Sequence, residues 1–158
     1  MHWFAVQRIV GILTGLFSLT FLPSIAVSLL YQDGQALDFV ISALIVLAFG
    51  AALFLPVYGH RKEVAVRDGF LIVALFWTLL GGAGALPLIL TIHLSFTDAM
   101  FEAFSGFTTT GATVVQNIDS LPPSILYHRQ QLQWLGGMGV IVLAVAILPM
   151  LGVGGMQL

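Results

Sequence analysis

Long apolar stretches separated by short polar ones dominate the sequence. A helix needs about 20 apolar residues to cross a hydrocarbon core of about 30 Å. Four stretches meet that length, at residues 9–30, 39–57, 70–92 and 132–151. The first contains Pro23, which a membrane helix tolerates because neighbouring helices can satisfy the freed carbonyl. The pattern therefore predicts an all-α polytopic membrane protein whose chain crosses the bilayer repeatedly.

The segment between the third and fourth stretches, residues 93–131, has a pattern of its own. Large apolar residues recur there at helical spacing: Phe96, Met100, Phe101, Phe104 and Phe107. They predict an amphipathic helix of about 10 residues, too short to span. Ser95 and Asp98 fit a capping box at its start. A short helix, then a threonine-glycine run and a return outward, indicates a re-entrant pore loop between an outer helix and an inner helix.

Composition supports a membrane protein and excludes several other classes. Hydrophobic residues make up 59% of the chain and charged residues 8%, whereas soluble domains carry roughly 25% charged residues. No basic stripe is present for a phosphate backbone, which argues against nucleic-acid binding. Cysteine is absent, which excludes a disulfide framework and a thiolate metal site. The apolar stretch near the amino terminus is too long for a secretory signal and indicates a retained first span.

The distribution of charge predicts the orientation. The cationic residues Arg8, Arg61, Lys62 and Arg67 fall on one side if each stretch crosses once, and cytoplasmic loops are enriched in such residues. The other side carries acidic residues, namely Asp33, Asp38, Asp98, Glu102 and Asp119, with Arg129 as the exception. Both ends are then expected in the cytoplasm and residues 93–131 outside. Asp98 and Glu102 share one helix face, where we expect capping, solvation and some attraction of cations.

The run Phe107-Thr108-Thr109-Thr110-Gly111-Ala112-Thr113-Val114 has the residue types of a cation path. Irregular backbone at membrane depth survives where it is buried in protein or lines a water-filled path. Backbone carbonyls can replace the hydration shell of a potassium ion. Gly111 can adopt the positive φ that such a strand demands. Threonine hydroxyls can add ligands or tie the strand to its surroundings. The run predicts potassium conduction without covalent chemistry or a cofactor.

Several motifs together resemble the Trk-type potassium uptake transporters, the TrkH-like membrane subunits of the Trk/Ktr/HKT superfamily. They are residues 96–113, Arg67-Asp68-Gly69-Phe70, Gly84-Ala85-Leu86-Pro87 and Trp134-Leu135-Gly136-Gly137-Met138-Gly139. The resemblance implies a pseudo-tetrameric pore built from four unlike repeats of outer helix, pore loop and inner helix. Residues 1–66 would be two leading helices with a cytoplasmic loop, and residues 67–158 the first repeat. The chain would be the amino-terminal portion of a longer protein.

The resemblance also implies the site and the partners. Its filter strand would be Thr109, Thr110, Gly111, Ala112 and Thr113, with potassium at the first four of these residues. Glycine at the position of Gly111 goes with potassium in the family, whereas serine in some relatives goes with sodium. The expected setting is the lipid bilayer of the cell inner membrane. The expected partners are a second copy of the full-length protein and a TrkA-like cytosolic subunit that binds nucleotides.

Two alternatives and one structural interpretation accompany this prediction. Four copies of the chain could form a simple homotetrameric cation channel. An intramembrane serine protease could use Ser105 as nucleophile with His93 or His128 as base, although these histidines are expected to be anchors or local pairs near the outer interface. The glycines of two clusters are expected to let helices pack closely, namely Gly81, Gly82 and Gly84, and Gly136, Gly137 and Gly139.

Overall fold

The computed structural model describes residues 3–59 and 66–150, and their side chains apart from 66–67 and 142–150. Three of the four cationic residues that predict the orientation lie outside this described part, namely Arg61, Lys62 and the side chain of Arg67. Helices and connecting segments make up all of it, which confirms the all-α prediction. In chain order the elements are α1 (Trp3–Ser18), α2 (Phe21–Tyr31), α3 (Ala36–Phe54), η1 (Leu55–Val57), α4 (Val66–Thr91), α5 (Phe96–Phe107), η2 (Ile118–Ser120) and α6 (Pro123–Met150).

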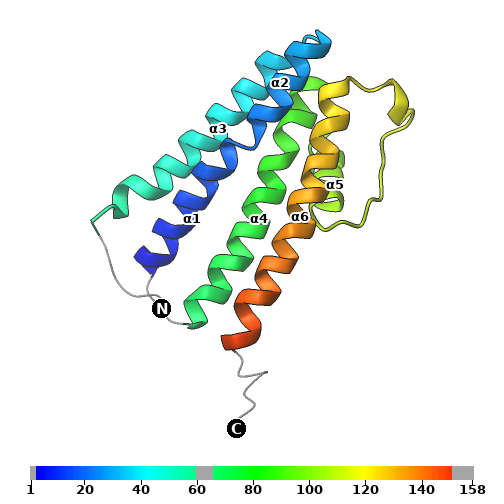
Figure 1. The fold of residues 1–158 in the computed structure, drawn as a ribbon. Coiled ribbons are helices and arrows are strands. Elements are labelled where there is room, and N and C mark those ends of the chain that lie inside the picture. Colours follow the sequence, from blue (N-terminus) through cyan, green and yellow to red (C-terminus); the bar gives the residue numbers. More distant parts are fainter. Residues whose placement is uncertain (1–2, 60–65, 151–158) are drawn as a thin grey trace.

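The long helices lie side by side in one bundle (Figure 1). The starts of α1 and α4 and the ends of α3 and α6 lie towards one end of the bundle, with the end of α3 set back from the end of α6. The link between α2 and α3 and the start of α6 lie at the other end, and α5 lies towards it. Within the part of the chain that the structure describes, three stretches are long and apolar enough to cross a membrane: Trp3–Tyr31, Ala36–Val57 and Asp68–Thr91. The fourth predicted span falls within the 28 residues of α6 as far as Met150.

The first predicted span is two helices rather than one. The break falls at Leu19 and Thr20, between α1 and α2. Pro23 explains it, because proline has no N–H to donate and its ring clashes with the carbonyl four residues earlier, here that of Leu19. Restarting the helix at Phe21 places Pro23 in a first turn, where proline is tolerated. The Thr20 hydroxyl donates to the Phe17 carbonyl at 2.7 Å.

Glycines bring α1 and α3 into backbone contact. A Cβ added to Gly50 would lie 2.6 Å from the Gly15 nitrogen and 2.9 Å from the Gly11 carbonyl oxygen. Small residues at a helix crossing allow this approach, which favours association in a membrane, where the hydrophobic effect between helices is absent. The leading helices are therefore packed through a glycine crossing.

Glycines of α4 make room for the two helices of the predicted pore loop unit. A Cβ on Gly81 would lie 2.4 Å from the ring of Phe104 in α5. A Cβ on Gly84 would lie 2.9 Å from the side chain of Leu132 in α6. The packing interpretation of these two glycines is confirmed. Buried apolar residues where these helices meet complete this part of the core, among them Leu88, Ala99, Ala103, Ile125 and Leu132.

Polar contacts join the leading helices to the start of α6. Asp33, in the link between α2 and α3, accepts a hydrogen bond from the Ser124 backbone nitrogen at 3.0 Å. It thereby caps the amino-terminal end of α6, where free amides and the helix dipole favour a carboxylate. The Gln131 side chain donates to the Thr20 carbonyl at 2.8 Å and accepts from the Ser24 hydroxyl at 3.2 Å. These hydrogen bonds therefore fix the position of α6 relative to α2.

Candidate functional site

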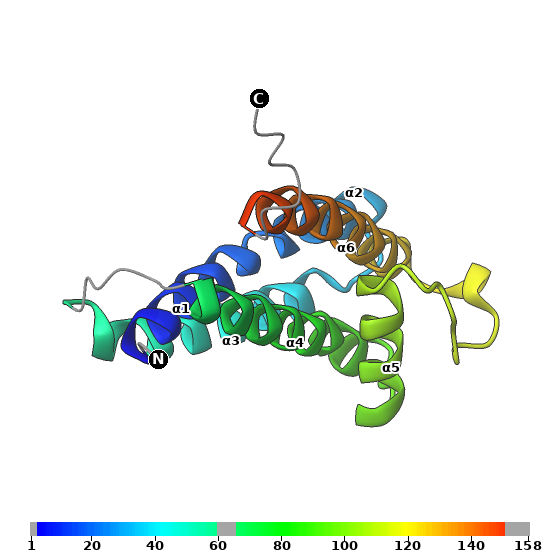
Figure 2. The same ribbon diagram turned by 90° about the horizontal axis from the view of Figure 1, so that it is seen from below.

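Helix α5 positions the site and has the predicted cap. The Ser95 hydroxyl oxygen accepts a hydrogen bond from the Asp98 backbone nitrogen at 3.1 Å and donates to the Asp98 carboxylate at 2.8 Å. The helix is 12 residues long, close to the length predicted from the phenylalanine spacing. Seen from below, α5 lies across the end of α4 and beside α6 (Figure 2). Its carboxyl end points at the threonine-glycine run.

The amides of that run turn back onto the end of α5. Four of them donate to its last carbonyls, Thr108 to Phe104 at 2.8 Å, Thr109 to Gly106 at 2.9 Å, and Thr110 and Gly111 to Ser105 at 3.0 and 3.2 Å. The last carbonyls of a helix lack intrahelical partners, so these bonds satisfy both groups. The irregular segment at residues 108–115, which we call the strand, is therefore bonded to α5 through its first four amides.

This orientation exposes the carbonyls on the opposite side of the strand. In a trans peptide the N–H and the C=O point in opposite directions. Because the Thr110 and Gly111 amides face α5, the Thr109 and Thr110 carbonyls face away from it. Within the described residues, no hydrogen bond ends on the carbonyl oxygen of Thr109, Thr110 or Gly111. The Ala112 carbonyl accepts from the Ser105 hydroxyl at 2.6 Å and keeps a second lone pair.

Two alternate residues of the strand have positive φ. Gly111 has φ 74°, as its sequence position predicted. Thr109 has φ 60°, which the sequence did not predict, because a β-branched residue there costs about 1–2 kcal/mol. Successive carbonyls of a regular strand point to opposite sides, and reversing φ at every second residue lets them turn the same way. The strained backbone is thus what a row of carbonyls on one side requires.

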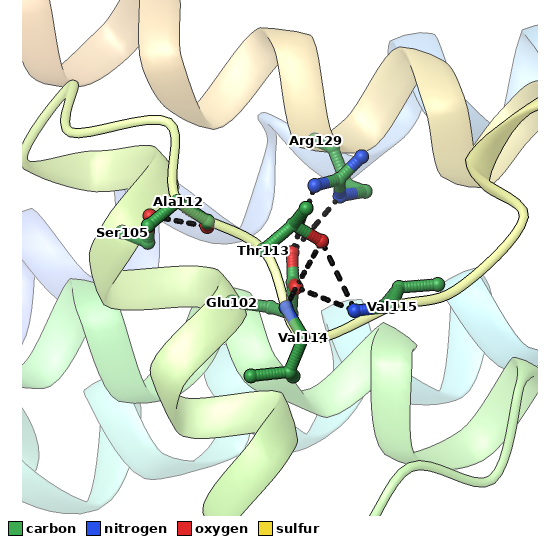
Figure 3. A network of polar contacts seen from close by, with 7 residues as sticks. All are labelled: Glu102, Ser105, Ala112, Thr113, Val114, Val115 and Arg129. Atoms are coloured by element: carbon green, nitrogen blue, oxygen red, sulfur yellow. Dashed lines mark hydrogen bonds and ion pairs between the residues drawn. The ribbon is translucent and has the colours of Figure 1, made fainter.

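Glu102 of α5 holds the continuation of the strand from behind (Figure 3). One carboxylate oxygen accepts from the Thr113 hydroxyl and from the backbone nitrogens of Val114 and Val115, at 2.6 and 3.3 Å for the two nitrogens. The other accepts from Nε and Nη2 of Arg129 in α6, at 3.1 and 2.8 Å. The sequence-based expectation that Glu102 is solvated and attracts cations is wrong, because the residue is 4% exposed and both carboxylate oxygens accept hydrogen bonds.

The same contacts determine the charge of Glu102. Burial raises the pKa of its carboxyl group, but the hydrogen bonds from Thr113, Val114 and Arg129, together with the Arg129 charge, outweigh burial and lower it. Glu102 is therefore ionised at neutral pH and matched by Arg129. The one signal in the sequence was Arg129 itself, the single cationic residue in an otherwise acidic segment. Its partner lies 27 residues away and could not be identified without the fold.

The glycines of α6 accommodate the end of α5 and the strand. A Cβ on Gly136 would lie 1.8 Å from the Phe107 carbonyl oxygen. On Gly137 it would lie 3.7 Å from the Thr109 side chain, and on Gly139 it would lie 3.2 Å from the ring of Trp77 in α4. Close packing, as predicted, explains Gly136 and Gly139. The contact between Gly137 and Thr109 shows that α6, the predicted inner helix, lies directly beside the strand.

The residues considered for a protease are engaged elsewhere. The Ser105 hydroxyl donates to the Ala112 carbonyl. His128 is buried against the rings of Phe21 and Phe39, and its Nε2 lies 2.9 Å from the Gly84 carbonyl oxygen. It is thus a core residue rather than an interfacial anchor, because α2, α3 and α4 enclose it. Within the described residues no hydrogen bond joins Ser105 to His128 or to the exposed His93.

Comparison with known proteins gives concordant results. The family described as "TrkH: Cation transport protein" matches residues 35–158. The chain is 60% identical to the Trk system potassium uptake protein TrkH of Halomonas elongata and 55% identical to that of Escherichia coli K12, covering 97% and 100% of this chain. It covers 32% and 33% of those relatives, so it spans about a third of their length.

A solved structure shares the fold. The crystal structure of the potassium transporter TrkH from Vibrio parahaemolyticus superposes with a TM-score of 0.91 at 53% identity, over 99% of this chain and 34% of the other. At this identity the similarity extends to sequence as well as to fold.

Proposed function

Because the chain belongs to the TrkH family of cation transport proteins, we propose that it takes part in potassium uptake across a membrane. Its part is to supply one of four pore loops around a shared path. The observation that carries this proposal is the row of carbonyl oxygens at Thr109, Thr110 and Gly111, bare of hydrogen bonds within the described residues. The names of the relatives, potassium uptake proteins of the Trk system, support the choice of ion.

A potassium ion that enters the path must lose its hydration shell, and the protein must replace the lost water oxygens. Carbonyl dipoles can replace its hydration shell without the fixed negative charge that would trap it. Thr109, Thr110, Gly111 and Ala112 would supply these oxygens, and Thr113 would end the strand and join it to Glu102. One strand cannot surround an ion. In the relatives, the length beyond the third that this chain matches would hold the other loops.

The expected organisation is part of the same proposal. Residues 1–66 act as two leading spans, the first of them divided into α1 and α2, and residues 67–158 as the first repeat of outer helix, pore loop and inner helix. The full-length protein would be a homodimer in the cell inner membrane, associated with a TrkA-like cytosolic subunit that binds nucleotides. The starts of α1 and α4 lie towards the same end of the bundle in Figure 1, which supports placing them, with Arg8 in α1, on the cytoplasmic side.

The test is rubidium or potassium uptake in cells that lack their own potassium import. This chain is compared with a version extended to the full length of its relatives. Rescue by the longer protein alone is expected. Rescue by the 158 residues themselves would favour the homotetrameric channel instead. In the longer protein, Gly111→Ser should reduce the preference for potassium over sodium, and an unchanged preference would contradict the filter assignment.

A further inference from the structure

We infer that Glu102, held by Arg129, is a positioning residue that sets the preference of the path for potassium over sodium; the inference rests on the proposed function. Glu102 does this from behind the strand, without touching the ion. Its carboxylate and the Ser105 hydroxyl, three residues further along α5, reach the strand at residues 112–115.

The contacts of the carboxylate require an ionised group. Three donors converge on one oxygen, the Thr113 hydroxyl and two backbone N–H groups, while two Arg129 nitrogens face the other. A carboxylate accepts at both oxygens, whereas the glutamine amide carries two N–H donors in place of one acceptor. Glutamine at residue 102 would direct a donor either at Arg129 or at the strand. One set of bonds must then break.

Displacement at Thr113 reaches the Gly111 carbonyl, the end of the row nearest to Thr113, because only Ala112 separates them. The Thr110 and Gly111 amides hold the earlier part of the strand to Ser105. Ala112 is held by one side-chain hydrogen bond, from Ser105. Apart from Gly111 and its two chain neighbours, no described residue has an atom within 4 Å of where a Cβ on Gly111 would be. A dehydrated sodium ion is smaller than potassium and needs shorter distances to oxygen. A strand released at residues 113–115 can move its carbonyls towards such distances, so potassium loses its advantage.

A direct electrostatic role for Glu102 does not fit its surroundings. The side chain is buried, and the Arg129 guanidinium lies 2.8 Å from its carboxylate. The two charges cancel at a distance, so the field outside the strand is small. Asp98, one turn earlier on α5, is bonded to Ser95 and belongs to the helix cap. It therefore offers a matched removal of one negative charge from the same helix without a change in the strand.

The experiment compares Glu102→Gln with Asp98→Asn in the full-length transporter, by rubidium and sodium uptake in cells lacking other potassium import. For Glu102→Gln the rubidium-to-sodium ratio should fall about tenfold, as expected for the loss of a hydrogen bond to a charged group. Asp98→Asn should leave the ratio unchanged. An equal fall in both variants, or lower uptake in both with an unchanged ratio, would indicate surface charge and overturn the inference.

Two further variants keep the inference testable if Glu102→Gln does not reach the membrane. Thr113→Val removes one donor and keeps the Glu102–Arg129 pair, and Arg129→Lys keeps the charge but loses the paired contacts. Each should lower the ratio less than Glu102→Gln. Unchanged ratios in both would overturn the inference. If the wild type fails to take up rubidium, the proposed function fails first, which distinguishes the two outcomes.

Discussion

Gly136 of α6 lies directly against the carbonyl oxygen of Phe107, the last residue of α5: a Cβ at Gly136 would be 1.8 Å from that oxygen. Neither partner can yield by rotating a side chain, because one is backbone and the other would be Cβ itself. The contact therefore fixes how far α6 stands from the residue at which α5 ends. The strand of the candidate ion path begins at the next residue.

Gly136→Ala should consequently impair the protein strongly. Separating α5 from α6 to admit a methyl group costs about 1–3 kcal/mol, as overpacking does elsewhere, and displaces the start of the strand. The measurement is thermal unfolding of the purified full-length transporter, together with rubidium uptake. Gly137→Ala is the control, because its Cβ would meet the Thr109 side chain at an ordinary 3.7 Å. Equal behaviour of the two variants would contradict the packing argument.

Gly111→Ala tests backbone conformation separately from space. Among the described residues, none beyond the two chain neighbours of Gly111 has an atom within 4 Å of its Cβ position. The φ of 74° therefore opposes the substitution, at about 1–2 kcal/mol. Gly34, between α2 and α3, has φ 81° and equally open surroundings. Gly34→Ala should thus destabilise the protein to the same extent. Uptake should fall only for Gly111→Ala; if both variants transport equally well, the strand conformation does not matter for transport.

Ser105→Ala should loosen the strand at Ala112. The substitution removes the hydroxyl that donates to the Ala112 carbonyl at 2.6 Å, a bond with a net value of about 0.5–1.5 kcal/mol. We expect uptake to persist with a moderately reduced rubidium-to-sodium ratio. Ser120→Ala removes a similar bond, from Ser120 to the Asn117 carbonyl at 2.7 Å, and should leave the ratio intact. Peptide hydrolysis that is present in wild type and lost in Ser105→Ala would instead revive the protease alternative.

The capping of α6 by Asp33 predicts a dependence of stability on pH. Burial raises the pKa of Asp33, but the hydrogen bonds from Ser124, Ser28 and Gln35 outweigh burial and lower it. A carboxyl group whose pKa is lower in the folded state stabilises the fold at pH values above its unfolded pKa. That contribution disappears as the pH falls through the folded pKa. The loss should therefore occur below about pH 4, the usual pKa of aspartate.

Asp33→Asn should remove this acid-sensitive contribution. The measurement is the unfolding temperature of the detergent-solubilised full-length transporter at pH 7 and at successively lower pH. The variant should be less stable than wild type at pH 7, and the difference should shrink on acidification. Asp38→Asn removes the same charge from the first turn of α3, where among the described residues the carboxylate has no hydrogen bond to α6, and should retain the wild-type pH dependence. A constant difference between wild type and Asp33→Asn at every pH would contradict the cap.

Local features of the fold followed from the sequence, and contacts between distant residues did not. The phenylalanine spacing and the Ser95–Asp98 pair predicted α5 because helix periodicity and capping act within a few residues. Gly111 was predicted because its backbone requirement is its own. The Glu102–Arg129 pair joins residues 27 apart and the Asp33–Ser124 bond residues 91 apart. Such pairs depend on how helices dock, which no short pattern encodes.

Two further differences between the sequence-based prediction and the structure have other causes. The positive φ at Thr109 runs against the preference of its side chain, so propensity pointed away from it. The break at Leu19 and Thr20 has a local cause in Pro23, but the continuous apolar stretch on both sides concealed it. Apolar length predicts where a chain crosses a membrane and says little about whether the crossing is one helix or two.

The bonds from the leading helices to α6 have a consequence for biosynthesis. Thr20, Ser24 and Asp33 receive partners from residues 124–131, which a ribosome adds about a hundred residues later. Until then helices α1 to α3 lie in the bilayer, and their polar groups are hydrogen-bonded to water, lipid headgroups or an insertion factor. Once α6 has been synthesised, it supplies the hydrogen-bond partners of the helices that were synthesised first. In nascent chains stopped before residue 131 the leading helices should crosslink to lipid or to an insertion factor. In chains stopped after residue 131 they should crosslink to α6.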